Sequence, residues 1–297
     1  GIRDVAVTGV QTCALPIFLC LERTDDGKMP LRGRKRHRYN APAGRPDNAV
    51  TGACLASGIL PHLAENKEGF RMGLPKAPIV LIPARMASTR LPNKPLADIH
   101  GEPMIVHVWR RAVEAAIGPV HVACAEPEIA RAIQKVGGQA ILTRADHPTG
   151  SDRIFEALEK LDPQGRHDAI VNVQGDLPTV DPKTVRAAFE ALADPAVDIG
   201  TVCARVGSDH EKTDPAVVKP VVAFAEGKTV ARAHYFSRAT VPSGEGAIYH
   251  HIGLYAYRRD ALKRFISLPQ GLLEKRERLE QLRALENGMR KIGRAHV

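Results

Sequence analysis

Residues 83–95 read PARMASTRLPNKP and place three permanent cations, Arg85, Arg90 and Lys94, among prolines and small side chains. The stretch is unsuited to a core, because these cations would be buried without partners, and its prolines break a long helix. Guanidinium forks and an ammonium match phosphate oxygens, while small residues such as Ser88 let backbone N–H groups approach them. The stretch therefore predicts a triphosphate site, with Lys94 as the charge at the reacting centre.

A second candidate is Asp176, in the segment QGD just after the apolar run AIVNV. Gly175 allows a close backbone approach, and Mg²⁺ takes one or two carboxylates together with substrate phosphates. In isolation, an aspartate after a glycine is better explained as a turn residue. The basic loop at 83–95 and the loop at 143–153 favour the metal-binding interpretation.

The segment TRADHPTGSDR at 143–153 is a third polar loop. Its TGSD portion fits a capping box at a helix start, which gives at least one hydroxyl a structural role. Arg144, Asp146 and Arg153 remain as candidates for reading a base or a ribose. The loop predicts nucleotide contacts beside the phosphates.

Apolar runs and helical periods alternate from residue 77 onward, which predicts a doubly wound, mostly parallel α/β sheet. Strands are expected at 77–83, 119–125, 139–144 and 168–173, and helices at 103–116, 126–138, 151–161 and 182–194. Ligands of such sheets lie beyond the carboxyl ends of the strands. The three polar loops follow such ends, so we expect them to face one crevice.

The second half predicts a smaller, β-rich subdomain beside this sheet. Strand-like segments lie at 217–224, 229–238 and 248–259, and a helix is expected at 272–287. Arg238 and His251 suit a carboxylate ligand, with Gln174 and Ser237 as candidate hydrogen-bonding partners. A structural histidine is the alternative for His251.

The amino-acid composition and charge limit the classes of protein to which this chain can belong. The 297 residues are 44% hydrophobic and carry a net charge of +9, with a basic run at 32–38 that could touch nucleic acid. Residues 1–75 sustain no period and predict coil outside the domain, and the apolar run at 5–21 makes a poor signal peptide because a proline interrupts it. Five cysteines without a Cys-x-x-Cys pair indicate a reducing cytoplasm.

Six motifs occur in order between about residues 78 and 290: PARxxSTRLPxKP, TRADHxxG[ST][DE]R, NVQGD, YFSRA, HxGxY and LEQLR. Together they resemble the CMP-Kdo synthetase family, the 3-deoxy-manno-octulosonate (Kdo) cytidylyltransferases. The resemblance implies a nucleotide-diphospho-sugar transferase fold and transfer of CMP from CTP to the anomeric hydroxyl of Kdo. It further implies release of pyrophosphate, a Mg²⁺ requirement, a role in lipopolysaccharide biosynthesis and a homodimer.

The resemblance also assigns residues, with Lys94, Arg85 and Asp176 expected to be catalytic. We expect no nucleic-acid or membrane partner. The assigned contacts are Arg85, Ser88, Arg90 and Lys94 for the CTP phosphates, Arg144 and Ser151 for the nucleotide, Asp176 for Mg²⁺, and Gln174, Ser237, Arg238, His251, Glu280 and Gln281 for the sugar.

Two departures from the family pattern affect these expectations. Leu177 stands where many relatives have glutamate. The first residues and the last, 291–297, resemble translated sequencing-adapter sequence, so we expect a domain of 76–290 (76–200 for nucleotide, 201–290 for sugar) between non-native ends. A missing strand and a missing second metal-binding aspartate would then reduce turnover.

Two other functions stay open. The first is activation of another acid sugar, such as a sialic acid, which also needs cations for a carboxylate. The second is a non-catalytic nucleic-acid binder that uses the basic run at 32–38.

Overall fold

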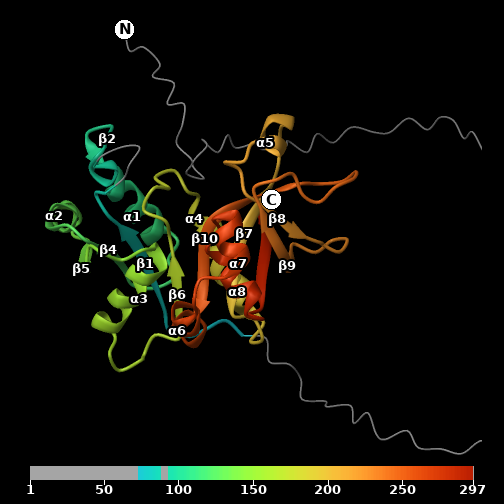
Figure 1. The fold of residues 1–297 in the computed structure, drawn as a ribbon. Coiled ribbons are helices and arrows are strands. Elements are labelled where there is room, and N and C mark those ends of the chain that lie inside the picture. The colour runs from blue at the N-terminus through green and yellow to red at the C-terminus, as the bar shows by residue number, and fades with distance from the viewer. Residues whose placement is uncertain (1–72, 88–92, 297) are drawn as a thin grey trace, which may run out of the picture. The chain divides into compact units, whose positions relative to one another are not determined.

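The computed structural model describes residues 73–87 and 93–296, which lie in one compact unit built on a nine-stranded sheet with helices on both faces (Figure 1). The strand order is β5-β4-β1-β6-β10-β7-β11-β9-β8, and β2 and β3 form a separate pair. The strands are β1 (Pro78–Ala84), β2 (Asp98–Ile99), β3 (Glu102–Pro103), β4 (Val120–Cys124), β5 (Gln139–Leu142), β6 (Ala169–Asn172), β7 (Ile199–Arg205), β8 (Lys219–Val222), β9 (Val230–Ser237), β10 (Tyr249–Arg258) and β11 (Lys291–His296).

The first half of the sheet is parallel, with β1 between β4 and β6 and β5 outside β4. Strand β10 runs antiparallel to both β6 and β7, and β9 antiparallel to β11 and β8. The predicted mostly parallel α/β fold is thereby confirmed.

Two layers of helices cover the sheet. On one face α1, α2 and α4 pack on Val80 and Ile82, while α3 and α6 pack on Ile79 and Leu81 on the other. Because both faces of β1 are covered, its sequence is almost continuously apolar. The helices are α1 (Met104–Glu114), α2 (Pro127–Lys135), α3 (Gly150–Leu161), α4 (Pro182–Glu190), α5 (Asp209–Thr213), α6 (Arg259–Ser267), α7 (Leu272–Glu277) and α8 (Gln281–Glu286), with 3-10 turns η1 (Lys94–Leu96) and η2 (Ala191–Ala193).

The β-rich part predicted for the second half lies at the far edge of the same sheet. Its own apolar cluster joins Val218 near β8 and Phe236 of β9 to Leu279 and Leu282 beside and within α8. The second half of the domain is therefore continuous with the sheet of the first half.

Two expectations about the chain's end need correction. The helix expected at 272–287 is two helices, because Arg278 adopts a left-handed conformation (φ 56°) between α7 and α8. We expected the domain to stop at residue 290 and to lack a strand, but β11 pairs with β7 and β9 inside the sheet. Its backbone hydrogen bonds fill the gap between those two strands.

None of the described helices is long and apolar enough to cross a membrane. The run at 5–21 and the basic run at 32–38 lie outside the described residues.

Candidate active site

The loops after β1 and β6 lie at the topological switch point of the sheet, where the order of the strands changes direction. β1 pairs with β4 on one side and β6 on the other, which is the position where open α/β sheets bind ligands. The loops touch at Gly175, where an added Cβ would lie 2.6 Å from the carbonyl oxygen of Pro83. Glycine is needed because its missing side chain lets the two backbones meet.

Lys94 and Asp176 form an ion pair at this point. The Nζ of Lys94 lies 2.9 Å from Oδ2 of Asp176, although the two residues are 82 positions apart. Their side chains are 16% and 27% exposed, so both remain open to a ligand. Lys94 begins η1, with Pro95 buried behind it. The structure thus joins the predicted phosphate lysine to the predicted metal carboxylate.

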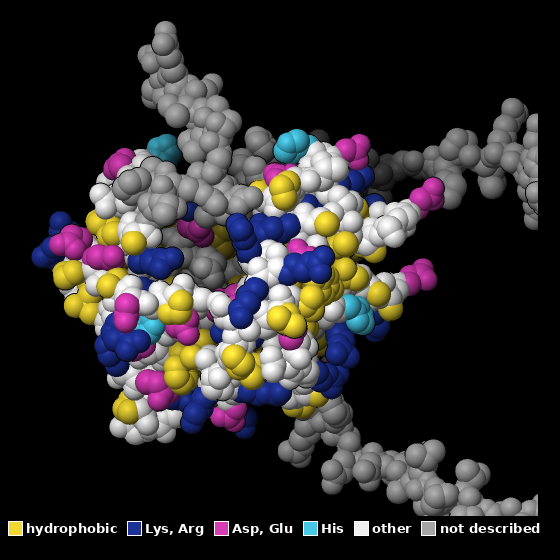
Figure 2. Space-filling model, in the orientation of Figure 1, with side chains coloured by type: hydrophobic (Ala, Val, Ile, Leu, Met, Phe, Trp, Pro, Cys, Tyr) yellow, Lys and Arg dark blue, Asp and Glu magenta, His cyan; other side chains and the backbone are white. Residues whose placement is uncertain are grey.

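The rest of the phosphate loop is described in part. Arg85 is exposed, and its Nη1 lies 3.5 Å from the carbonyl oxygen of His147, in the third polar loop. Ser88 and Arg90 lie outside the described residues. Figure 2 shows Lys and Arg side chains gathered around a hollow on one face of the molecule. A basic hollow of this kind attracts anionic ligands.

The loop before α3 supplies both a cap and a contact across the site. Thr149 is the N-cap, and its hydroxyl oxygen accepts the N–H of Asp152 at 3.2 Å, as the capping box predicts. Ser151 is buried and its hydroxyl donates to Oε2 of Glu280 at 3.1 Å. This bond links the predicted nucleotide and sugar halves.

Arg144 and Arg153 have different environments. Arg144 is exposed, and its Nε lies 3.3 Å from Oδ1 of Asp146, so it is free to move toward a ligand. Arg153 is buried, and its Nη1 donates to the Thr143 hydroxyl at 2.6 Å and the Arg144 carbonyl at 2.9 Å. Arg153 therefore stabilises the loop at 143–153 through buried hydrogen bonds, and its side chain is not exposed for contact with a base.

Glu280 is the N-cap of α8 and Gln281 its first residue, shortly after the turn at Arg278. Burial raises the pKa of Glu280, and hydrogen bonds from Thr149 and Ser151 together with the charge of Arg283 partly offset this. Oε1 of Glu280 and Nε2 of Gln281 are buried without a hydrogen-bond partner in the described part of the chain. Buried polar atoms are normally paired, so these two indicate a missing ligand or water.

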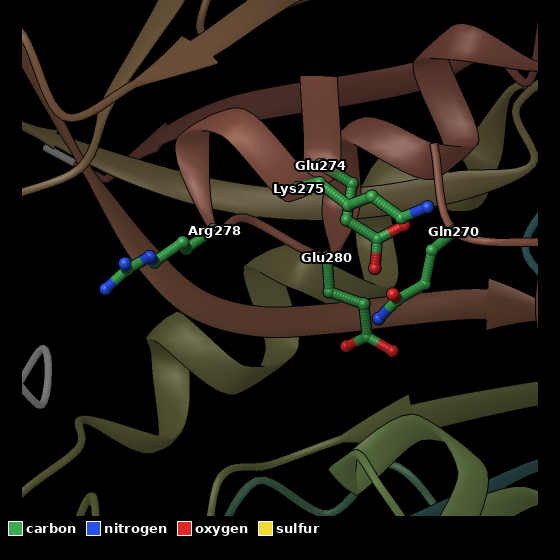
Figure 3. Close-up of a pocket in the computed structure, with 5 residues that line it drawn as sticks. All are labelled: Gln270, Glu274, Lys275, Arg278 and Glu280. Atoms are coloured by element: carbon green, nitrogen blue, oxygen red, sulfur yellow. The ribbon is translucent and has the colours of Figure 1, made fainter. Parts of the chain in front are cut away.

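A cavity of about 340 Å³ opens beside Glu280. In Figure 3 the side chains of Glu280 and Gln270 point toward each other, and that of Arg278 points away from them. Gln270, Glu274, Lys275, Arg278 and Glu280 line it. The size and polar lining suit a hydroxylated small molecule.

His251 is buried in β10. The Thr201 hydroxyl donates to the Leu254 carbonyl at 2.8 Å, so its oxygen accepts from Nε2 of His251 at 2.9 Å. Burial, and then the nearby charge of Lys291, hold the pKa of His251 well below its usual value. A neutral His251 can offer hydrogen bonding but no charge to a sugar carboxylate.

Ser237 is the last residue of β9 and Arg238 follows it. Both are hydrogen-bonded to Glu277 at the end of α7. The Ser237 hydroxyl donates to Oε1 of Glu277 at 2.9 Å. The Arg238 guanidinium donates to the carbonyls of Pro215 at 3.0 Å and Glu277 at 3.1 Å. Because a guanidinium has five N–H donors, Arg238 keeps N–H groups for a ligand.

Gln174 lies between the two halves. An added Cβ on Gly150, at the start of α3, would be 3.9 Å from Oε1 of Gln174, and one on Gly253 of β10 would be 3.6 Å from its Cγ. The half-buried Gln174 side chain therefore lies beside both α3 and β10.

Within residues 73–87 and 93–296, no three His, Cys, Asp or Glu side chains gather closely enough to hold a metal ion. A metal at Asp176 would therefore draw on ligands from outside such a protein cluster, such as the oxygens of a substrate.

A family model described as cytidylyltransferase matches residues 79–292. The chain belongs to the cytidylyltransferase family. The matched range covers every site residue discussed above.

Two relatives and one solved structure place the chain more closely within the cytidylyltransferases. Proteins named 3-deoxy-manno-octulosonate cytidylyltransferase from Paramagnetospirillum magneticum and Rhodospirillum rubrum are 65% and 64% identical, over 72% of this chain and 87% and 85% of theirs. A solved CMP:2-keto-3-deoxy-manno-octonic acid synthetase complexed with CTP is 38% identical, with a TM-score of 0.68 over 74% of this chain and 90% of that one. These matches confirm the family predicted from the six motifs, and they identify this cytidylyltransferase as an enzyme.

Three residues near the site were missed by sequence reasoning. Glu126 accepts the N–H of Met86, in the phosphate loop, at 3.0 Å. Glu277 holds the end of β9, and Lys291 is buried between the rings of Phe236 and Tyr255. No local pattern distinguishes the two glutamates from helix surface charges, and Lys291 fell in the segment assigned to a tail.

Proposed function

We propose that the protein transfers CMP from CTP to the anomeric hydroxyl of Kdo, giving CMP-Kdo and pyrophosphate for lipopolysaccharide biosynthesis in the cytoplasm. The observation that carries the proposal is the contact between Lys94 and Asp176 at the switch point of the sheet. The names of the relatives and the CTP bound to the solved neighbour support the choice of substrates.

The nucleotide half binds the triphosphate. Arg85, Ser88, Arg90 and Lys94 are the proposed phosphate ligands, and Lys94 balances the charge that develops on the departing pyrophosphate. Arg144 is exposed beside them for the nucleoside, with Ser151 at the start of α3. Transfer of this kind is achieved mainly through charge neutralisation and in-line positioning.

Magnesium fits this site as an ion held chiefly by the substrate. Oδ1 of Asp176 accepts no hydrogen bond within the described part of the chain, which leaves it available as one ligand. Two or more phosphate oxygens would supply others, as is usual for Mg²⁺. When bound, the ion would stabilise charge on the phosphates.

The sugar half holds the acceptor. Arg238 is the proposed cation for the sugar carboxylate, while Gln174, Ser237, His251, Glu280 and Gln281 bond its hydroxyls. The unpaired buried atoms of Glu280 and Gln281 support this assignment. The anomeric oxygen bonds to the α-phosphorus as its proton is lost, and the bond between that phosphorus and the bridging oxygen breaks.

A pyrophosphate-release assay with CTP, Kdo and Mg²⁺ tests the proposal, with mass spectrometry of the product. We expect CMP-Kdo at a reduced rate, because no cluster of three metal-ligating side chains lies within residues 73–87 and 93–296 to hold the metal. Absence of turnover with Kdo would contradict the proposed function. Preferential turnover of a sialic acid under the same conditions would show that the acceptor is another acid sugar.

The homodimer implied by the resemblance is also a proposal. Val230 of β9 and Leu272 of α7 offer exposed apolar side chains to a partner. Light scattering coupled to size-exclusion chromatography should give twice the mass of the chain.

A further inference from the structure

Glu277 collects three hydrogen bonds from one strand. Its carboxylate accepts the Ser237 hydroxyl at 2.9 Å, the Arg238 N–H at 3.1 Å and the Tyr235 hydroxyl at 3.4 Å. Tyr235 and Ser237 lie at the end of β9 and Arg238 directly follows it, whereas Glu277 is the last residue of α7. A single carboxylate therefore fastens the helix to the strand.

The Arg238 side chain adds hydrogen bonds to the same junction, and these run from the end of β9 to the main chain at the end of α7. Its Nε donates to the Glu277 carbonyl at 3.1 Å, and its Nη2 lies 3.5 Å from the Arg278 carbonyl. The junction therefore holds the main chain at the point where α7 stops and Arg278 turns into the left-handed region.

The turn at Arg278 decides where the next residues point. Glu280 follows two positions later, lines the cavity and accepts the Ser151 hydroxyl from the nucleotide half. Had α7 continued as a regular helix, Glu280 would have been placed differently, because each residue rotates the side chain by about 100° around the axis.

We propose that Glu277 is a positioning residue for the acid-sugar half, holding Ser237, Arg238 and the α7–α8 turn so that Arg238 and Glu280 face one substrate. This inference rests on the proposed function. Glu277 itself acts through its neighbours and is not proposed to touch the reacting atoms.

The variant Glu277→Gln tests the proposal with little change in volume. Glutamine has a single acceptor oxygen, which can accept from the Ser237 hydroxyl or from the Arg238 N–H, whereas the carboxylate accepts from both. The variant therefore loses one of the two acceptors and the negative charge. We expect the KM for Kdo, and the dissociation constant of Kdo measured by calorimetry with CMP present, to rise about 10-fold. The dissociation constant of CTP and the melting temperature should stay close to those of the wild type.

Two further variants serve as controls. Glu277→Asp keeps both acceptor oxygens and should recover part of the Kdo affinity. Glu128→Gln removes an exposed carboxylate that pairs with Arg131 on α2, and should leave the binding of both substrates unchanged.

Unchanged Kdo affinity in folded Glu277→Gln would overturn the proposal. The proposal would also be overturned if the affinities for CTP and Kdo fell equally, with or without a large fall in melting temperature. Such a result would indicate that Glu277 has a merely structural role. Failure of the wild type to turn over Kdo while still binding it would refute the proposed function alone, because the affinity ratio of the two proteins would still report on Glu277. Failure of the wild type to bind Kdo would refute both.

Discussion

Replacing Lys291 with methionine should stabilise the protein. Lys291 is 1% exposed, and its Nζ lies 4.7 Å from the centre of the Phe236 ring and 4.5 Å from that of Tyr255. It forms no ion pair within the described part of the chain, although the charge of Glu280 attracts it. Methionine would fill a similar volume and keep favourable contacts with both rings.

The size of the effect follows from the cost of burying an ammonium. Exchanging buried charges for well-packed apolar side chains often stabilises by about 1–4 kcal/mol. For a domain of this size, each kcal/mol raises the melting temperature by roughly 2–4 °C. We therefore expect an increase of at least about 2 °C at neutral pH.

The stabilisation should also depend on pH. Burial holds the pKa of Lys291 well below the ordinary value of 10.5, so the folded protein releases a proton that the unfolded chain keeps. Stability of the wild type should therefore rise with pH until the unfolded pKa is reached, by up to about 1.4 kcal/mol per pH unit from this group. The variant lacks this contribution, so its advantage should shrink as pH rises toward 10.5.

Urea denaturation of both proteins between neutral pH and pH 10 measures this difference. A variant that is less stable than the wild type at neutral pH, or whose advantage does not change with pH, would refute the reasoning. Lys228→Met, at an exposed turn, is the matched control and should show neither effect.

Two other changes test the backbone of the site. Gly175→Ala should destabilise by about 1–3 kcal/mol and weaken CTP binding, because its Cβ would lie 2.6 Å from the Pro83 carbonyl oxygen. Gly207→Ala, where nothing lies within 4 Å, is the control, and equal melting temperatures for the two would contradict this account. Arg278→Gly should stabilise by about 0.5–1 kcal/mol because φ is 56° there. Arg276→Gly, inside α7, is the control and should destabilise by about 1 kcal/mol. If calorimetric scans show that Arg278→Gly lowers the free energy of unfolding by as much as Arg276→Gly, the proposed strain at Arg278 is ruled out.

The nucleotide half was predictable because its signals are local. The apolar run of β1, the capping residue Thr149 and the loops at strand ends each follow from a few neighbouring residues, and the rule for open sheets then brings Lys94 toward Asp176. The sequence reasoning placed these two residues in one crevice, and the structure puts them in contact.

The sugar half depended on the resemblance because its geometry is set by tertiary contacts. The helical pattern of 272–287 continues through Arg278, and the break there is held by tertiary bonds that Glu277 and Arg238 make between α7 and the end of β9. Strand β11 contains a buried lysine and a glycine, so it lacks an apolar alternation and is fixed by pairing with β7 and β9. Such pairings cannot be read from a single segment.

The central claim is that Lys94 and Asp176 together hold the triphosphate and its metal. Calorimetric titration of CTP, with and without Mg²⁺, into the wild type, Lys94→Met and Asp176→Asn tests it most directly. We predict that Mg²⁺ tightens CTP binding to the wild type, that Asp176→Asn abolishes this Mg²⁺ effect, and that Lys94→Met weakens binding about 10-fold or more in both conditions. Unchanged CTP affinity in Lys94→Met, together with a full Mg²⁺ effect in Asp176→Asn, would contradict the account.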